Sequence, residues 1–205
     1  MITLHHLNQS RSKRIIWLLE ELGLDFQITP YHRDSVTFLA PPELTSVHPL
    51  GKSPVIEMNG EVIAESGAIT EILIDTYAAD VLAPKRGTAA YRDYLQWLHF
   101  AESSAMLPLL LKLFVAKDGA PTNFLQGYAD SEADKILSYF DQRLEGKQYL
   151  VGEKLSGADI MMSFIVDVTA QFGLLARYPN IQRYAATLAE HPASQKAQQL
   201  EAQYA

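Results

Sequence analysis

A short polar turn near the N-terminus carries residue types that suit the binding of an anion. It runs from Asn8 to Arg14 and holds Ser10 and Ser12 beside three basic residues. Cations at a helix N-terminus are opposed by the helix dipole, by roughly 0.3 to 1 kcal/mol each, so another interaction must favour them. The turn therefore predicts an anion site at the start of a helix. In the alternative interpretation Arg11 and Lys13 are solvated, Arg14 pairs with a carboxylate elsewhere, and the serines are only N-caps.

Two further segments carry groups that suit the ends of a small zwitterion. Glu65 and Ser66 lie between a strand and a helix, where Ser66 can receive a carboxylate and Glu65 can hold an ammonium group. Lys52, Ser53 and Pro54 lie just before a hairpin, and the X-Pro bond can be cis or trans. In the alternative interpretation Ser66 is an N-cap and Lys52 is a solvated loop charge.

The N-terminal part of the chain alternates between strand and helix patterns. Residues 1–7 and 26–31 have strand patterns, whereas helical spacing covers 12–23 and 66–77. The Asn59-Gly60 pair accepts the positive φ angles of a type I′ turn, so residues 55–64 predict a hairpin. The order βαβ, loop, ββα predicts a small mixed sheet with helices on it.

The C-terminal part predicts helices throughout. Pro84 disfavours helix around it, so we expect a linker over 80–87, between a first domain of 1–79 and an all-helical domain of 88–205. Glycine and proline breaks separate the helical stretches, which cover 88–117, 122–145, 156–176, 178–190 and 193–203. The predicted fold class is therefore α/β followed by all-α.

Two patterns in the helical part stand out. Phe100, Ser103, Ser104 and Leu107 fall at i, i+3, i+4 and i+7 of the long helix expected from residue 88, so they would share one face. That face predicts either a substrate pocket or close helix packing. The segment from Ser156 to Asp159 is a variant of the capping box at the start of an apolar helix, and we interpret it as structural.

Composition excludes several kinds of chemistry. The 205 residues include no cysteine, so a disulfide, a thiolate metal site and a cysteine nucleophile are excluded. None of the six histidines has metal-ligand spacing, and adjacent His5 and His6 would point to opposite faces of a strand, so we expect no metal. A net charge of −7 argues against nucleic acid as a partner. Without a secretory signal or a membrane segment, a cytoplasmic protein is expected.

Three segments together resemble the cytosolic glutathione transferase family, in its serine-type, theta- or bacterial-like form. They are NQSRSKRIIWLLEELGL, HPLGKSPVIEMNGEVIAESGAI and GEKLSGADI, in the family's order over essentially the whole chain. The resemblance implies a thioredoxin-like βαβαββα domain that binds glutathione, followed by a C-terminal helical bundle domain. It also implies a homodimer and a detoxifying role.

The resemblance implies catalysis by an ionised thiol. Ser10 matches the serine that donates a hydrogen bond to the glutathione sulfur, with Ser12 as the fallback. The thiolate would attack a small hydrophobic electrophile held in a pocket formed by Asn8, Phe100, Ser103, Ser104 and Leu107. A glutathione-dependent isomerase or peroxidase on the same fold, or a non-catalytic interaction protein, are the alternatives.

The resemblance also assigns the residues that hold glutathione, the co-substrate. Lys52 matches a lysine that binds the glycyl carboxylate, and Glu65 and Ser66 match the pair that binds the γ-glutamyl end. Ser53 would pair through its backbone with the cysteinyl moiety, ahead of a cis Pro54.

Overall fold

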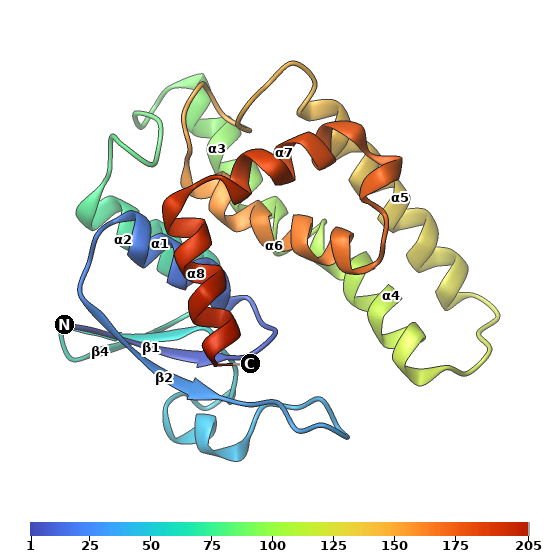
Figure 1. The fold of residues 1–205 in the computed structure, drawn as a ribbon, viewed down its shortest axis with the longest axis horizontal. Coiled ribbons are helices and arrows are strands. Elements are labelled where there is room, and N and C mark those ends of the chain that lie inside the picture. The colour runs from blue at the N-terminus through green and yellow to red at the C-terminus, as the bar shows by residue number, and fades with distance from the viewer. Residues whose placement is uncertain (205) are drawn as a thin grey trace. The chain divides into compact units, whose positions relative to one another are not determined.

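The chain folds into two compact units (Figure 1). The structure is a computed structural model in which residues 1–204 are described. One unit comprises Met1–Ala83 together with the residues from Leu188 onward, and the other comprises Pro84–Thr187. The last helix of the chain, which we expected to belong with the other helices, thus clusters with the N-terminal segment.

The first unit contains a four-stranded mixed sheet with the strand order β2-β1-β3-β4. The strands are β1 (Ile2–Leu7), β2 (Phe26–Tyr31), β3 (Val55–Met58) and β4 (Glu61–Ala64). β1 pairs in parallel with β2 and antiparallel with β3, so the predicted helical crossover is present. The β3–β4 hairpin turns at Asn59 and Gly60, whose φ values of 53° and 83° are those expected of this pair.

Three helices complete the first unit: α1 (Ser12–Glu21), α2 (Ser66–Tyr77) and α8 (Pro192–Gln203). The consecutive apolar residues of α1 from Ile15 to Leu19 are all buried, so this turn of the helix is enclosed on every side. α8 lies against α1 (Figure 1), where the rings of Trp17 and His191 are 6.0 Å apart. A short 3-10 helix, η1 (Pro42–Ser46), takes the place of the middle helix, and the thioredoxin-like order is confirmed.

The second unit is all helical over its described residues, as predicted. Its elements are α3 (Ala89–Phe100), α4 (Met106–Asp118), α5 (Leu125–Arg143), α6 (Gly157–Gln171), η2 (Leu175–Arg177) and α7 (Pro179–Ala189). Aromatic rings from three helices meet in its core, where Phe140 lies 5.8 Å from Trp97 and 5.9 Å from Tyr184. Such rings bury large apolar areas and dominate the packing energy.

The prediction of one continuous helix over 88–117 is wrong, because the α-helical hydrogen-bonding pattern is interrupted between α3 and α4, although Ala101 and Ala105 keep right-handed helical φ and ψ angles. There the Ala105 N–H bonds to the carbonyl of Phe100, five residues back instead of four. Pro108 explains the break, since it has no N–H to donate to Ser104 and its ring would clash with that carbonyl. The interruption lies between Phe100 and Leu107, so the common face expected for Phe100, Ser103, Ser104 and Leu107 does not lie on one continuous helix and stays a prediction.

The buried carboxylate of Asp159 accepts several hydrogen bonds at the N-terminus of α6. Asp159 accepts hydrogen bonds from the N–H and the hydroxyl of Ser156, at 2.8 and 2.7 Å, which confirms the capping box. It also accepts from the Leu150 N–H at 2.9 Å and from the Tyr184 hydroxyl at 2.7 Å. Burial raises the pKa of Asp159, and the hydrogen bonds oppose that rise.

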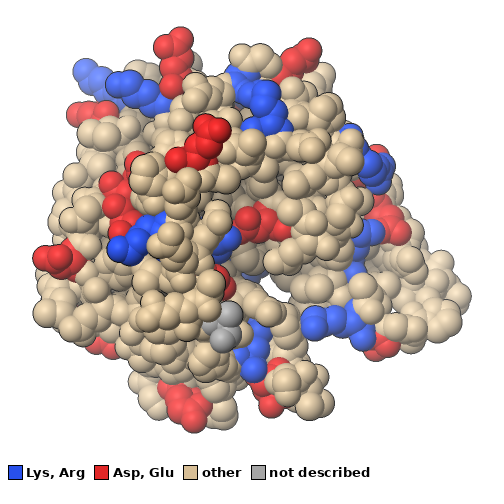
Figure 2. Space-filling view, in the orientation of Figure 1, with Lys and Arg blue, Asp and Glu red and all other residues tan. Residues whose placement is uncertain are grey.

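Charges of both signs are mixed on the surface. On the face that Figure 2 shows, Lys and Arg lie among Asp and Glu and form no continuous basic stripe. This arrangement provides no field of one sign on that face to attract a polyanion. Within the described part of the chain, no helix is both long and apolar enough to cross a membrane.

Candidate functional site

The turn between β1 and α1 brings two serine hydroxyls into contact. Ser10 Oγ and Ser12 Oγ are 2.8 Å apart, and Ser10 Oγ also accepts a hydrogen bond from the Ser12 N–H at 3.2 Å. Ser10 thus satisfies a backbone N–H at the start of α1. Ser12 is fully enclosed, whereas 5% of Ser10 remains exposed. Of the two serines, Ser10 is therefore the one that retains some exposed surface.

A buried histidine and a glutamate from α8 extend this line of polar groups. Ser12 Oγ lies 2.7 Å from His6 Nδ1. His6 Nε2 lies 3.1 Å from Glu201 Oε2, at ion-pair distance, although the N–H does not point straight at that oxygen. The other carboxylate oxygen accepts from the Gln9 N–H at 3.0 Å. We call the four side chains Ser10, Ser12, His6 and Glu201 the Ser10–Glu201 chain.

The side chains of the two adjacent histidines lie on opposite faces of β1, as predicted. His5 Nδ1 lies 2.9 Å from the Tyr31 hydroxyl, and His5 Nε2 lies 2.9 Å from Glu57 Oε1. Burial, followed by the charge of Glu57, raises the pKa of Tyr31. Among the described residues, no group of three or more His, Asp or Glu side chains is placed to hold a metal ion.

Two guanidinium groups, those of Arg11 and Arg33, lie near each other at the β1–α1 turn. Arg33 donates to the carbonyl oxygens of Phe38 at 3.0 Å and Gln9 at 3.5 Å. Burial, followed by the charge of Arg11, lowers the pKa of Arg33, yet an arginine stays protonated at neutral pH. The Asn8 side chain, predicted for the substrate pocket, accepts from the Arg33 N–H at 2.9 Å and so fixes the backbone beside the turn.

The loop before β3 is joined to β1 through a serine side chain. Ser53 Oγ donates to the carbonyl oxygen of His5 at 2.7 Å and accepts from the Leu7 N–H at 3.1 Å. These bonds continue the strand pairing past Pro54, which has no N–H of its own. The Ser53–Pro54 peptide bond is cis. The neighbouring Lys52 is exposed, so its amine is accessible to a ligand.

Glu65 and Ser66 open α2 beside α1. Glu65 has a φ of 70° and a ψ of 114°, a sparsely populated backbone conformation that costs a non-glycine residue on the order of 1 to 3 kcal/mol and is common at functional sites. Its side chain is exposed. Ser66 is buried, and Arg14 Nη1 of α1 donates to its hydroxyl oxygen at 3.4 Å. This contact brings the positive ends of two helix dipoles into one region.

The other predicted pocket residues lie in the second unit. Phe100 is half-buried against two aromatic rings of α3 and α5, at centroid distances of 5.3 and 5.7 Å. The Ser103 hydroxyl donates to the carbonyl four residues earlier at 2.9 Å. Ser104 and Leu107 are exposed. Phe100 and Ser103 thus make their contacts within the second unit. The assignment of all four residues to a substrate pocket stays a prediction.

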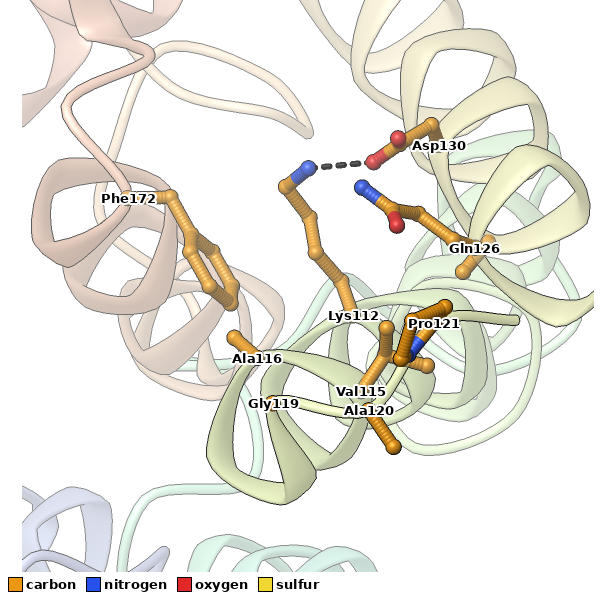
Figure 3. Close-up of a pocket in the computed structure, with 10 residues that line it drawn as sticks. Lys112, Val115, Ala116, Gly119, Ala120, Pro121, Gln126, Asp130 and Phe172 are labelled. Carbon is orange, nitrogen blue, oxygen red and sulfur yellow. Dashed lines mark hydrogen bonds and ion pairs between the residues drawn. The ribbon is translucent and has the colours of Figure 1, made fainter.

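The second unit contains a cavity of about 500 Å³ that none of these four residues lines. It lies between α4, α5 and the end of α6 (Figure 3). Lys112 points across it to Asp130, with which it is paired, and its ammonium lies 5.6 Å from the centroid of the Phe172 ring. The rest of the lining is Val115, Ala116, Gly119, Ala120, Pro121, Gln126 and Ala129. No periodic sequence signal predicts the cavity, because it depends on how three helices pack.

Comparison with known proteins identifies the family. The family model described as "Glutathione S-transferase, N-terminal domain" matches residues 1–74, and its C-terminal counterpart matches residues 106–192. Glutathione S-transferase 3 of Schizosaccharomyces pombe is 34% identical to the chain, over 94% of the chain and 85% of that relative. The chain belongs to the glutathione S-transferase family.

Solved structures share both parts of this transferase. A crystal structure of a glutathione S-transferase from Actinobacillus pleuropneumoniae matches with a TM-score of 0.89 and 38% identity, over 98% of this chain and 93% of that one. A sphingomonad glutathione S-transferase complexed with glutathione matches with a TM-score of 0.79 and 26% identity, over 98% of both chains. The family and the fold implied by the sequence resemblance are therefore confirmed.

The loop that carries Lys52 of the transferase requires a glycine. Gly51 has a φ of 56°, and a Cβ there would lie 2.9 Å from Cγ2 of Thr45. We expect Gly51→Ala to lower the free energy of unfolding by about 2 kcal/mol, roughly half from the left-handed alanine and half from the close contact. Gly60→Ala is the control, since Gly60 also has positive φ but open space around it. Urea-induced unfolding measures both, and equal losses would contradict the contact with Thr45.

Proposed function

We propose that this transferase binds glutathione on its first unit and holds the thiol as a thiolate beside Ser10. The observation that carries the proposal is the Ser10 hydroxyl, which lies at the N-terminus of α1 in a turn flanked by Arg11 and Arg33. A hydroxyl donor, a helix N-terminus and two guanidinium groups all favour negative charge at one place. The enclosure of Ser12 supports Ser10, rather than Ser12, as the group that meets the sulfur.

The two ends of glutathione have candidate partners in the same unit. Lys52 and Glu65 are both exposed and offer opposite charges to a carboxylate and an ammonium group. Ser66 adds the N-terminus of α2 as a second place for a carboxylate. The sphingomonad relative, which is solved with glutathione bound, supports the choice of ligand.

Together these groups can supply the free energy needed to ionise the thiol. A free thiol with a pKa near 8.5 is only a few per cent ionised at pH 7, and lowering its pKa by about two units requires about 2.7 kcal/mol. A charge-assisted hydrogen bond supplies roughly 1.5 to 3 kcal/mol, and the helix N-terminus adds a smaller share. The thiolate then attacks a small hydrophobic electrophile. We also infer a homodimer from the family resemblance, which sedimentation velocity would test.

Calorimetric titration with glutathione tests the proposed site. We expect saturable binding by the parent protein and about tenfold weaker binding by the double variant Lys52→Ala, Glu65→Ala, because it loses a charged partner at each end of the ligand. The control variant Lys196→Ala, Glu61→Ala removes the same two charges from other exposed positions of the first unit.

Each outcome of the titration has a distinct meaning. Unchanged affinity in the Lys52 and Glu65 variant would contradict the assignment of the two ends. A parent protein that does not bind glutathione would favour a non-catalytic interaction protein. Saturable binding that is lost in the variant justifies a screen of electrophiles and peroxides, which separates transferase activity from isomerase and peroxidase activity.

A further inference from the structure

The Ser10–Glu201 chain provides a route for the proton that the thiol must lose. We propose that His6 accepts this proton through Ser12 and Ser10, and that Glu201 stabilises the imidazolium that forms. This inference rests on the proposed binding of glutathione at Ser10. His6 and Glu201 do not touch the sulfur, so both are positioning residues that act through the two hydroxyls.

The single proton of Ser12 sets the direction of the hydrogen bonds. Ser12 Oγ has three polar neighbours: Ser10 Oγ at 2.8 Å, His6 Nδ1 at 2.7 Å and the Leu7 carbonyl oxygen, to which it can donate at 3.1 Å. Of the two groups that can take the Ser12 proton, Nδ1 is the nearer. A neutral imidazole protonated on Nε2 has an acceptor at Nδ1, which takes the Ser12 proton. Ser12 Oγ then accepts from Ser10, and the Ser10 proton points inward, away from the ligand. In this resting state Ser10 Oγ can accept a proton from the thiol.

Glu201 selects the tautomer that this resting state needs. Its Oε2 lies 3.1 Å from His6 Nε2, and both atoms are closed off from solvent. Without a proton on Nε2, two buried acceptors would face each other, which is costly. The ring of Tyr204, the residue that follows α8, lies 6.2 Å from the His6 ring between centroids. The carboxylate is thus the charged partner that favours a protonated Nε2, and Nδ1 is left to face Ser12.

A thiol placed at Ser10 completes the line of proton transfer. The S–H bond breaks as a new O–H bond forms on Ser10, Ser10 passes its former proton to Ser12, and Ser12 passes its own to Nδ1 of His6. A neutral thiol and a neutral imidazole become a thiolate and an imidazolium, so one proton has moved and the total charge is unchanged. Each hydroxyl now points the opposite way, and Ser10 donates to the thiolate. The Glu201 carboxylate pairs with the imidazolium and favours these products.

Glu201→Gln is the single substitution that tests the proposed route most directly. The amide oxygen keeps an acceptor for the Gln9 N–H, whereas the amide nitrogen donates to His6 Nε2 and leaves the ring proton on Nδ1. His6 then cannot accept from Ser12, although the side-chain volume is preserved. Ser12→Ala interrupts the chain at a second point. Glu190→Gln is the matched control, because it removes one carboxylate from an exposed position of the same unit.

The test counts protons while glutathione binds near pH 7. Calorimetry in buffers of different ionisation enthalpy gives the protons released, and ultraviolet absorbance gives the thiolate formed. For the parent protein and Glu190→Gln we expect thiolate with almost no proton released, since His6 retains it. For Glu201→Gln and Ser12→Ala we expect about tenfold less thiolate and a similar fall in kcat/KM, with any remaining thiolate accompanied by about one released proton.

The outcomes separate this inference from the proposed function. Release of about one proton per thiolate by the parent protein would overturn the route to His6 and leave glutathione binding intact. Parent-like thiolate and proton counts in Glu201→Gln and Ser12→Ala would overturn it as well. A parent protein that does not bind glutathione would overturn the proposed function itself. Circular dichroism of both variants confirms that a loss of thiolate is not a loss of fold.

Discussion

Replacing Asp159 with alanine is expected to lower the free energy of unfolding of the helical unit by about 4 kcal/mol. The change removes the acceptor of four buried hydrogen bonds, two from Ser156 and one each from Leu150 and Tyr184. A buried donor left without a partner costs roughly 1 to 3 kcal/mol, and relaxation recovers part of the sum. Burial raises the pKa of Asp159 because a charged carboxylate is unfavourable away from water. The four hydrogen bonds offset that cost by stabilising the charged form.

Urea-induced unfolding followed by circular dichroism measures this loss. Asp134→Ala is the control, because Asp134 accepts from Arg177 at 2.6 Å and from the Tyr178 hydroxyl at 2.8 Å but is exposed to water. Its replacement should cost less than about 1 kcal/mol. Similar losses in the two variants would show that burial of the donors does not set the cost.

Ser10→Ala is expected to lower kcat/KM for conjugation of glutathione by about 10- to 100-fold at neutral pH. The variant loses a charge-assisted hydrogen bond of roughly 1.5 to 3 kcal/mol to the thiolate, and each 1.4 kcal/mol is about tenfold in rate. The pKa of the bound thiol should rise toward that of the free thiol. Activity should therefore fall most near pH 7 and recover as the pH rises through about 8.5, where even an unassisted thiol ionises.

The pH–rate profile with a model electrophile measures both effects. Ser10→Thr keeps a hydroxyl at the position and should retain more of the rate than Ser10→Ala. Ser35→Ala removes a hydroxyl from an exposed loop of the same unit and should behave as the parent protein. Full turnover and an unshifted profile in Ser10→Ala would contradict the assignment, and Ser12 would be the next hydroxyl to test.

Local sequence signals predicted much of the fold, because they reflect local physics. The Asn59-Gly60 pair fixes its hairpin through backbone preference alone, and the helical spacing over 12–23 predicted the helix α1. The alternation of side chains along a strand was enough to separate His5 from His6. Local patterns predicted the order βαβ, loop, ββα, and the resemblance added a middle helix to give the thioredoxin-like order, which the structure and the family comparison confirm with η1 at that position.

The features that were missed depend on distant parts of the chain. A helical pattern over α8 does not say which helix it packs against, so the contact of Glu201 with Gln9, across 192 positions, has no sequence signal. The break between α3 and α4 had a local cause in Pro108, but apolar spacing on both sides concealed it. The assigned glutathione residues and the pocket residues from Phe100 to Leu107 stay predictions until binding is measured.

The first unit is not a continuous stretch of sequence, because the second unit is inserted between its two parts. A chimera that joins the first 83 residues of one transferase to the remainder of another would pair α1 of one parent with α8 of the other. Such a hybrid could keep every glutathione-binding residue of its first parent and still lose the carboxylate that faces His6. Recombination at the junction between the units would therefore separate the β1–α1 turn from the helix whose Glu201 carboxylate accepts a hydrogen bond from Gln9 of that turn.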